Sequence, residues 1–377
     1  MLLPEMLLRW KRKHSYTLMA VLDHLSLELW ERYGLTFAAE YVIPPSVMEG
    51  SVSLKLVPLL YLRRLLVVVR QLGSLPVPDV IYTSSDYFTD IVPALLLRTL
   101  YRSRGIKWMA RVYHVVGPPG SREGGFLQNF AAFVEQRVSL WMISSFADRV
   151  VTMAGTYDEL SEMGFPTAKL AISNAGVELA EAQETRSSEQ KFDAVSICRI
   201  HPTKGIWDLV DIWHGVTKTL PSARLAIIGG GPDHLVKELR TRIEERGLSE
   251  SVVYLGYLPT RSEVFGVLKG SGMYLDAEHE DGWSLAVCEA MACGLPVVSY
   301  KLHMFNKAFK QGVVLVPLRD VKGFSNAVTE LLLNSNQRSR LSEESLIEVK
   351  KYTWDSVAED MYELIVREVG RDSPRNV

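Results

Sequence analysis

Residues 280–298, EDGWSLAVCEAMACGLPVV, decide the fold, because they predict an acidic loop, a short helix and then a buried strand. Ser284 is a favourable N-cap, residues 285–293 are good helix formers, and Gly294 is a suitable C-cap. Free N–H groups and a positive dipole end at the helix start favour an anion such as a diphosphate. Glu289 lies among apolar residues of this helix, where a carboxylate is costly to bury unless donors such as ligand hydroxyl groups reach it.

Helix-like and strand-like segments alternate along the 377 residues, which predicts two domains with parallel sheets covered by helices. The expected strands are at residues 16–22, 36–42, 80–83, 107–114, 149–153, 169–172, 192–198, 224–228, 251–255, 273–276, 296–299 and 312–316. We expect a first domain at 1–177, a polar linker at 178–191 and a second domain at 192–353. An amphipathic helix at 354–369 is expected to cross back onto the first domain, before a disordered tail at 370–377.

The beginning of the chain departs from this pattern. Residues 1–14 predict a helix, whereas a doubly wound domain should begin with a strand and a glycine-rich turn. We therefore expect the first domain to lack its first strand and its Gly-rich loop. The alternative is that residues 16–22 are the first strand, although the DHLS sequence that follows them contains no glycine.

Composition excludes several function classes. The formal net charge of −2 gives no reason to expect a nucleic-acid partner. Cations beside apolar runs, at residues 9–14 and 54–72, predict either core-facing helices with a solvated basic edge or a peripheral contact of the first domain with an anionic membrane. No uncharged run is long enough to span a bilayer, no secretory signal is recognisable, and the three cysteines have no zinc spacing. We expect a cytoplasmic protein, with peripheral contact to the inner face of the membrane left open.

Two strand ends in the second half combine features that suit phosphate groups. Arg199 and Lys204 lie on a turn after an expected strand, and a forked guanidinium with an ammonium group can clamp a diphosphate. The IIGGGPD sequence at 227–233 places Gly230 and Gly231 between a strand and a helix, where the backbone can approach a ligand closely. The alternatives are that Arg199 and Lys204 are solvated surface cations and that the glycine sequence at 227–233 forms a purely structural turn.

His114 ends the apolar strand of the first half. The Gly-Pro-Pro-Gly sequence at 117–120 predicts a loop, which would place the imidazole at the mouth of a crevice rather than in the core. A structural histidine is the alternative. The acidic residues Glu278, Glu280 and Asp281 are expected to stay solvated, and no cluster has metal-ligand spacing, so no resident metal or other cofactor is expected.

The sequences RIHPTKG, IIGGGP, VVYLGYLP and DGWSLAVCEAMACGLPVV together resemble, in order and spacing, the second domain of retaining GT-B glycosyltransferases of glycosyltransferase family 4. The resemblance is strong over residues 192–299, moderate over 114–177, where RVYHVV matches a His-bearing strand end, and faint before that. It implies two Rossmann-like domains that face each other across a cleft. A nucleoside-diphosphate sugar donor would bind mainly to the second domain and an unidentified acceptor to the first.

Position by position, the resemblance implies a donor site on the second domain. Arg199 and Lys204 would hold the donor diphosphate and offset charge on the leaving group. Backbone N–H groups at Ser284 and Leu285 would add donors to the phosphate, and Glu289 would accept hydrogen bonds from the ribose hydroxyl groups. The glycine loop that contains Gly230 and Gly231 would border the same donor.

The resemblance also implies residues near the transferred sugar. His114 would contact the sugar near its reacting carbon, and Asp281 takes the place of the first acidic residue of the family's Glu-x7-Glu motif, with a reach shorter by a methylene. The implied reaction is a metal-independent hexosyl transfer with retention of configuration and no protein nucleophile. The acceptor, which can be a polysaccharide, a glycolipid or a small molecule, is not identified, and the basic-apolar segments favour a lipid-linked one.

Two other function classes stay open. A catalytically impaired GT-B protein that acts as a nucleotide-binding or scaffold subunit would account for the departures at Asp281 and in the first domain. A nucleotide-sugar epimerase of the same fold would form its product without an acceptor. A Rossmann dehydrogenase is disfavoured because its glycine fingerprint is missing.

Overall fold

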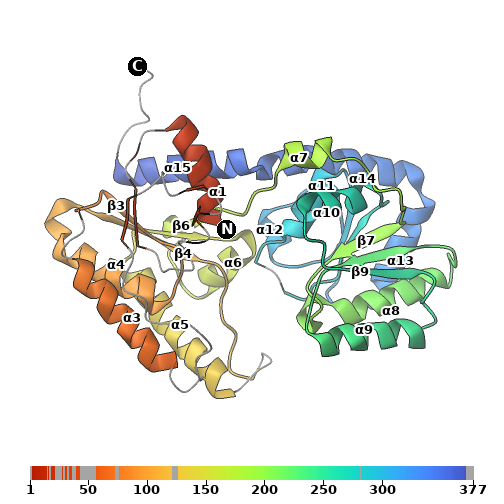
Figure 1. Ribbon diagram of the computed structural model, residues 1–377, viewed down its shortest axis with the longest axis horizontal. Coiled ribbons are helices and arrows are strands. Elements are labelled where there is room, and N and C mark those ends of the chain that lie inside the picture. Colours follow the sequence, from red (N-terminus) through yellow and green to blue (C-terminus); the bar gives the residue numbers. More distant parts are fainter. Residues whose placement is uncertain are drawn as a thin grey trace. The chain divides into compact units, whose positions relative to one another are not determined.

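The computed structural model describes residues 2–14, 16, 18–21, 28, 30–31, 34–35, 40–42, 57–72, 76–120, 126–280 and 282–370. The chain forms two compact units (Figure 1). Unit 1 comprises Met1–Ser173 and Val357–Val377, and unit 2 comprises Asn174–Ser356. Each unit contains a parallel sheet covered by helices, as the alternating pattern predicts.

The sheet of unit 2 has six parallel strands, β7 (Ala194–Ile197), β8 (Leu225–Ile228), β9 (Val252–Gly256), β10 (Tyr274–Asp276), β11 (Val297–Tyr300) and β12 (Val313–Val316). Their order is β12-β11-β10-β7-β8-β9. The order reverses between β7 and β10, so the carboxyl ends of these two strands form the topological switch point. Open α/β sheets bind their ligands at this kind of position.

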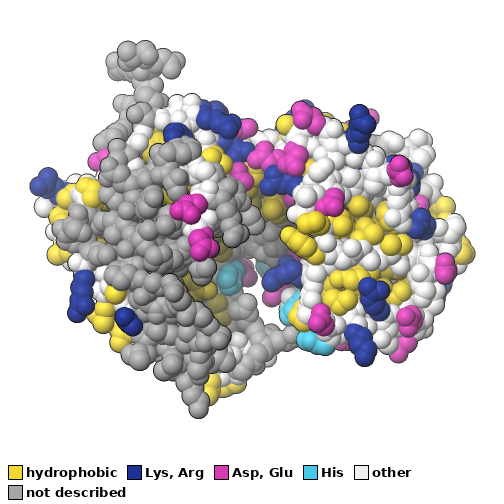
Figure 2. Space-filling view, viewed as in Figure 1, with side chains coloured by type: hydrophobic (Ala, Val, Ile, Leu, Met, Phe, Trp, Pro, Cys, Tyr) yellow, Lys and Arg dark blue, Asp and Glu magenta, His cyan; other side chains and the backbone are white. Residues whose placement is uncertain are grey.

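Helices cover both faces of this sheet (Figure 1). They are α7 (Leu179–Glu184), α8 (Ile206–Thr217), α9 (Asp233–Glu245), α10 (Arg261–Lys269), α11 (Leu285–Ala292), α12 (Met304–Lys307), α13 (Val321–Leu333) and α14 (Ser335–Glu348). One apolar core joins the sheet to α8, α9 and α13 and includes the fully buried Trp213 and Phe324. In the view of Figure 2, positive and negative side chains are interspersed over unit 2, in keeping with the formal net charge of −2.

Residues 178–191, which we expected to be a linker, belong to unit 2. Helix α7 in this segment is held by an ion pair between Glu181 and Arg261, with 3.0 Å between the charged atoms. Lys269 Nζ also donates hydrogen bonds of 2.6 and 2.7 Å to two carbonyl oxygens of the segment. The polar composition therefore reflects charged contacts with the neighbouring helix α10 and an exposed surface, rather than a free connection.

The main sheet of unit 1 has four parallel strands in the order β3 (Val80–Thr83), β4 (Lys107–Val112), β5 (Arg149–Thr152) and β6 (Leu170–Ile172). Side chains of β4 alternate between two apolar cores, as the pleat requires. Trp108 packs with α4 (Phe88–Leu100), α5 (Phe126–Phe146) and α6 (Ala154–Glu162), whereas Met109 packs with α1 (Leu2–Lys13) and α15 (Trp354–Val369). Helix α15 starts in unit 2 and belongs to unit 1 from Val357.

The first strand is present in short form. Strand β1 (Met19–Val21) pairs in parallel with β2 (Glu40–Val42), within the segment that was the alternative position for a first strand. The residues directly after β1, where a Gly-rich loop would follow, and the tail at 371–377 lie outside the described residues. Among the described helices, which also include α3 (Val57–Gln71), none is both long and apolar enough to cross a membrane.

Candidate functional site

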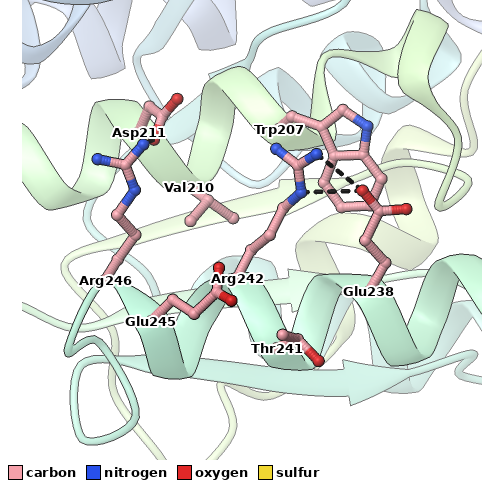
Figure 3. A pocket seen from close by; sticks show the side chains of 8 residues that line it. All are labelled: Trp207, Val210, Asp211, Glu238, Thr241, Arg242, Glu245 and Arg246. Carbon is pink, nitrogen blue, oxygen red and sulfur yellow. Dashed lines mark hydrogen bonds and ion pairs between the residues drawn. The ribbon is translucent and has the colours of Figure 1, made fainter.

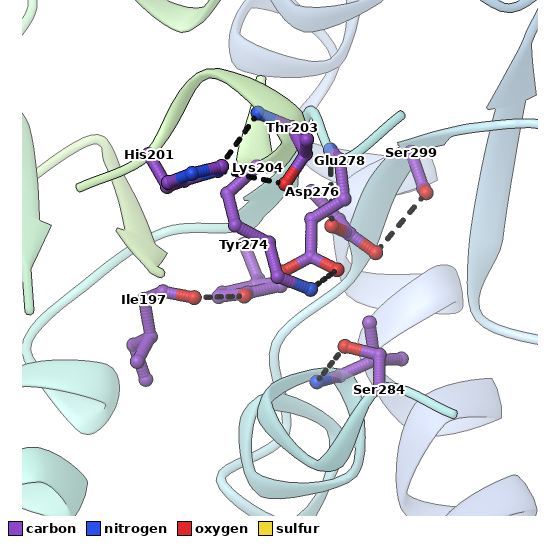
Figure 4. A network of polar contacts seen from close by, with 10 residues as sticks. Ile197, His201, Thr203, Lys204, Tyr274, Asp276, Glu278, Ser284 and Ser299 are labelled. Carbon is purple, nitrogen blue, oxygen red and sulfur yellow. Dashed lines mark hydrogen bonds and ion pairs between the residues drawn. The ribbon is translucent and has the colours of Figure 1, made fainter. Parts of the chain in front are cut away.

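The candidate site lies at the switch point of unit 2 (Figure 4). The short 3-10 helix η5 (Pro202–Lys204) follows β7, and Glu278 follows β10. Lys204 Nζ donates a 2.7 Å hydrogen bond to Glu278 Oε2, and the two side chains are 18% and 10% exposed. Glu278, which we expected to be solvated, is therefore a buried partner of Lys204. The pair fixes the ammonium group at the strand ends.

The turn that carries Lys204 is locked against the strand end after β10. Gly205 has a left-handed φ of 62°, and a Cβ atom there would lie 1.6 Å from the Ala277 carbonyl oxygen. The His279 N–H donates a 3.1 Å hydrogen bond to the Thr203 carbonyl oxygen. These contacts require glycine at position 205, and they hold the base of the Lys204 side chain in a single place.

Arg199 differs from Lys204 in its surroundings. It follows β7 between the buried residues Cys198 and Ile200, and its own side chain is exposed. In the part of the chain that the structure describes, no carboxylate pairs with it. The switch point thus carries one cation that is held by an internal carboxylate and one that is open to solvent.

The glycine loop after β8 packs against the same turn. A Cβ atom at Gly229 would lie 1.8 Å from the Cys198 carbonyl oxygen, and one at Gly231 would lie 2.6 Å from the Ile200 carbonyl oxygen. The Ile200 N–H donates a 2.9 Å hydrogen bond to the Gly230 carbonyl oxygen. Close backbone packing therefore accounts for Gly229 and Gly231, whereas a side chain at Gly230 would meet only an ordinary van der Waals contact.

The start of α11 has the cap that the sequence predicts. Ser284 Oγ accepts a 3.3 Å hydrogen bond from the Val287 N–H, and Ser284 is 4% exposed. Leu285 begins the helix and is exposed. The cap satisfies one of the free N–H groups of the first turn. The remaining positive end of the helix dipole favours a negative charge here.

Trp283 anchors this helix start through contacts that the sequence did not predict. Its ring stacks on Phe309 at 4.6 Å and meets Tyr352 edge-on at 5.1 Å. The Tyr352 hydroxyl group accepts a hydrogen bond from the Phe309 N–H and donates one to the fully buried Glu348, at 3.1 and 3.2 Å. Because these aromatic residues come from three separate segments, only their individual apolar character is visible in the sequence.

Glu289 is half-buried on α11, and no hydrogen bond reaches its carboxyl group from the described residues. Burial raises the pKa of this group to about 7, while the nearby Arg261 lowers it and Glu181 raises it further. A partly protonated carboxyl group is therefore present at neutral pH. Ligand hydroxyl groups that donate to it would favour its charged form.

A buried polar network supports the strand ends (Figure 4). Asp276, which is 2% exposed, accepts hydrogen bonds from Ser299 Oγ at 3.3 Å and from the Glu278 N–H at 3.4 Å. The Tyr274 hydroxyl group donates to the Ile197 carbonyl oxygen at 3.1 Å. Burial raises the pKa of the Cys198 thiol to about 12, so this thiol is not a nucleophile at neutral pH.

His114 lies in unit 1, two residues beyond the end of β4, and its side chain is exposed. The buried Gln136 fixes the backbone there, since its Nε2 donates to the His114 carbonyl oxygen at 2.8 Å and its Oε1 accepts from the Val116 N–H at 2.6 Å. The imidazole itself remains available. Asp281, the other residue expected near the sugar, lies outside the described residues.

A separate hollow of about 300 Å³ lies between α8 and α9 (Figure 3). Its cations are already paired, Arg242 with Glu238 at 2.7 Å and Arg246 with Asp211 at 2.6 Å. The lining residues are Trp207, Val210, Asp211, Glu238, Thr241, Arg242, Glu245 and Arg246. None of the expected site residues is among them. Within the described residues, no three His, Cys, Asp or Glu side chains are grouped to hold a metal ion.

The strand order of unit 2 is that of the Rossmann fold of dinucleotide-binding domains. Two Rossmann-like units in one chain are the arrangement of the GT-B fold. The structure is similar to Anabaena Alr3699/HepE in complex with UDP, with a TM-score of 0.71 and 15% identity over 97% of this chain and 96% of that one. It is also similar to sucrose-phosphate synthase from Thermosynechococcus elongatus, with a TM-score of 0.66 and 16% identity over 88% and 84%. At these identities the likeness concerns the fold.

Residues 178–346, which lie within unit 2, match the family model of Glycosyl transferases group 1. A phosphatidyl-myo-inositol mannosyltransferase of Mycobacterium leprae is 28% identical over 42% of this chain and 41% of that protein. The putative colanic acid biosynthesis glycosyltransferase WcaL of Escherichia coli is 27% identical over 55% and 51%. The chain thus spans about half or less of the length of these curated relatives.

Proposed function

We propose that this protein is a glycosyltransferase that transfers a sugar from a nucleoside-diphosphate donor to an acceptor. The match of residues 178–346 to Glycosyl transferases group 1 supports this activity. The observation that carries the proposal is that Lys204, Arg199 and the capped start of α11 follow β7 and β10, two strands that pair in parallel in one sheet. Cations and helix N-termini suit the charge that develops on a departing diphosphate.

Lys204 and Arg199 have different proposed roles in holding the diphosphate. The ion pair with Glu278 orients the Lys204 ammonium group in advance, so that little rearrangement is needed when a phosphate oxygen becomes a second partner. Arg199 is exposed and can form a forked, charge-assisted hydrogen bond with the same diphosphate. Gly230, Ser284 and Leu285 would contribute backbone N–H groups.

Glu289 is the proposed partner of the donor ribose. Its half-buried carboxyl group has no hydrogen-bond donor among the described residues and has a pKa of about 7. Two vicinal hydroxyl groups would supply the donors that this group lacks, and they would favour its charged form. We therefore expect donor binding to release a proton near neutral pH.

Retention of configuration and independence of a metal belong to the same proposal. Arg199, Lys204 and the α11 dipole would offset the charge of the leaving diphosphate. His114 would contact the transferred sugar, and Asp281 would position it rather than attack it. Anomeric configuration of the product, read by NMR, and transfer in the presence of a chelator test these two points.

The names of similar proteins support a proposed donor and a proposed acceptor class. HepE binds UDP and UDP-glucose, which makes uridine donors the first to examine. One curated relative is named a phosphatidyl-myo-inositol mannosyltransferase and another a putative colanic acid biosynthesis glycosyltransferase, so we propose an acceptor from the cell envelope, either a glycolipid or a growing polysaccharide.

Contact with the inner face of a membrane would bring the protein to a lipid-linked acceptor. Of the two basic-apolar segments, α1 turns Leu7 and Trp10 into the core of unit 1. In contrast, α3 exposes Leu62 and Leu66, which are 52% and 50% exposed, next to the exposed Arg63. Helix α3 is therefore the better candidate. Sedimentation with anionic vesicles tests this contact, which a Leu62→Glu variant should abolish.

A nucleotide-sugar panel tests the proposed function. At least one UDP-sugar or GDP-sugar should raise the unfolding temperature of the full chain, and the same donor should release its nucleoside diphosphate when an acceptor extract is added. Protection without release would instead support a nucleotide-binding subunit. Product formed from the donor alone would support an epimerase. No protection by any member of the panel would contradict a donor site.

A further inference from the structure

Asp208 of unit 2 accepts hydrogen bonds from the loop after β10 and from the end of β11. It lies in the first turn of α8, and its Oδ2 atom is 2.9 Å from His279 Nε2 and 2.9 Å from the Tyr300 hydroxyl oxygen. A carboxylate only accepts hydrogen bonds, so both His279 Nε2 and the Tyr300 hydroxyl group are donors here. Three separate segments therefore meet at one carboxylate oxygen.

The core of unit 2 holds this cluster in place. Tyr300 is the last residue of β11, is fully buried, and meets the Phe324 ring edge-on at 5.1 Å. Burial raises the pKa of the Tyr300 hydroxyl group and Asp208 raises it further, so this group remains a donor at neutral pH. The side chains of His279 and Asp208 are only 19% and 21% exposed. Tyr300 thus fixes Asp208, and Asp208 fixes the His279 ring.

His279 fastens the loop after β10 at two points. Its N–H donates a 3.1 Å hydrogen bond to the Thr203 carbonyl oxygen in η5, and its ring is bonded to α8 through Asp208. The residue directly before it is Glu278, whose carboxylate pairs with Lys204. Because Glu278 and His279 share a peptide unit, which is planar and stiff, the two bonds of His279 restrict where the Glu278 carboxylate can lie.

We propose that His279 is a positioning residue of the diphosphate site, which holds Glu278, and through it the Lys204 ammonium group, in the orientation that receives a phosphate oxygen. This inference rests on the proposed function, because it concerns the same diphosphate. His279 itself does not touch the donor and acts through the pair of Lys204 and Glu278. A charge that is already oriented binds its ligand with less reorganisation, so a loosened Glu278 should weaken the binding of a nucleoside diphosphate.

The first test measures the affinity of the full chain for UDP and for GDP by titration calorimetry. His279→Ala should weaken binding of the tighter nucleotide by about tenfold, the middle of the range for residues that are coupled. His279→Gln should bind within about twofold of the wild type, because its amide Nε2 can donate to Asp208 as the imidazole does. His214→Ala, at a half-buried position in the last turn of α8, is the matched control and should bind as the wild type does. Wild-type affinity in His279→Ala overturns the proposal.

The second test separates positioning from a general structural role. In a protein with both Lys204→Met and Glu278→Gln, no charged pair remains to be oriented, so adding His279→Ala should change nucleotide affinity by less than about twofold. Thermal unfolding at millimolar nucleotide registers the weak binding expected in this background and shows that each variant is folded. A structural role would give the same tenfold loss with and without the charged pair, and that result overturns the proposal.

The same measurements distinguish a failure of this inference from a failure of the proposed function. If neither UDP nor GDP binds to the wild type, both are overturned. If a nucleotide binds to the wild type and more weakly to Lys204→Met, while His279→Ala binds it as the wild type does, the proposed function stands and only the role of His279 is wrong. A loss in His279→Ala that His279→Gln restores, and that disappears without the charged pair, is the result that the proposal predicts.

Discussion

The carboxyl edges of the two sheets are built in different ways. In unit 2 the edge is fixed by a buried ion pair, Lys204 with Glu278, and by glycine turns in direct backbone contact. In unit 1 the edge presents an exposed His114 on a backbone that Gln136 holds. The sheet edge of unit 2 therefore carries a charge that is held in place, that of Lys204, whereas the sheet edge of unit 1 carries the exposed side chain of His114. Under the proposed function, donor binding would depend on unit 2 alone, and His114 of unit 1 would affect transfer.

The largest effect should come from Lys204. In Lys204→Met, transfer should fall by about 10²–10³-fold because one preorganised charge on the leaving group is lost. Glu278 would also remain buried without its ammonium partner, at a cost of about 3–5 kcal/mol in the free energy of unfolding. Kinetic assays and urea unfolding measure these two losses separately.

A double variant separates the two roles of Lys204. Lys204→Met with Glu278→Gln removes both charges, so the free energy of unfolding should largely recover while transfer stays low. Recovery of transfer together with stability would show that Lys204 is only a structural residue.

Arg199 should have the next largest effect, and without any change in stability. Arg199→Ala should weaken donor binding by about 1.5–3 kcal/mol, or roughly tenfold to hundredfold, as expected for a charge-assisted hydrogen bond. Titration calorimetry with the donor measures the affinity. Arg340→Ala, at an exposed position on α14, is the control and should bind as the wild type does. Equal affinities in the two variants would remove Arg199 from the site.

His114 sharpens the contrast between the units. His114→Ala should lower kcat by about tenfold, as expected for one lost polar contact to the sugar, while the affinity for the nucleoside diphosphate alone is unchanged. Comparison of kcat with the calorimetric affinity for UDP checks this expectation. Weaker UDP binding in this variant would contradict the assignment of donor binding to unit 2 alone.

Glu289 should have the smallest effect, visible only as a pH dependence. Because its pKa is raised to about 7, wild-type affinity for a nucleotide-sugar should rise several-fold between pH 6 and 8 as the carboxyl group ionises. In the same protein the free energy of unfolding should fall as pH rises from about 4.5 to 7, since the folded state binds the proton more tightly than the unfolded state. Glu289→Gln should lack both slopes. A nucleotide-sugar is the suitable ligand, because neither esterified phosphate titrates in this range.

Much of the fold can be predicted from the sequence because its signals are local. Buried parallel strands are short apolar runs between turns, and the structure has a strand within or overlapping every expected segment. The Ser284 cap and the α11 boundaries also follow from neighbouring residues. The segment at 178–191 was expected to be a linker, but its polar residues contact α10. Because α10 is distant from this segment in the sequence, no local pattern predicts these contacts.

The parts of the site that the sequence does not reveal involve distant residues. Lys204 and Glu278 are separated by 74 positions, so no local sequence pattern indicates their pairing. From the sequence alone, the acidic loop around Glu278 is expected to be solvated. The Trp283, Phe309 and Tyr352 cluster likewise joins three segments. On α5, apolar residues occur on all sides, and only the structure separates those that are buried from those that are exposed.

Hydrogen–deuterium exchange of the full chain, with and without UDP or GDP, tests the central claim most directly, because it locates the nucleotide. We predict slower exchange of the amides at 198–205, 229–231 and 284–287, which border the switch point of unit 2, and unchanged exchange around His114 in unit 1. Slower exchange confined to the hollow between α8 and α9, or no change with either nucleotide, would contradict a donor site at this sheet edge.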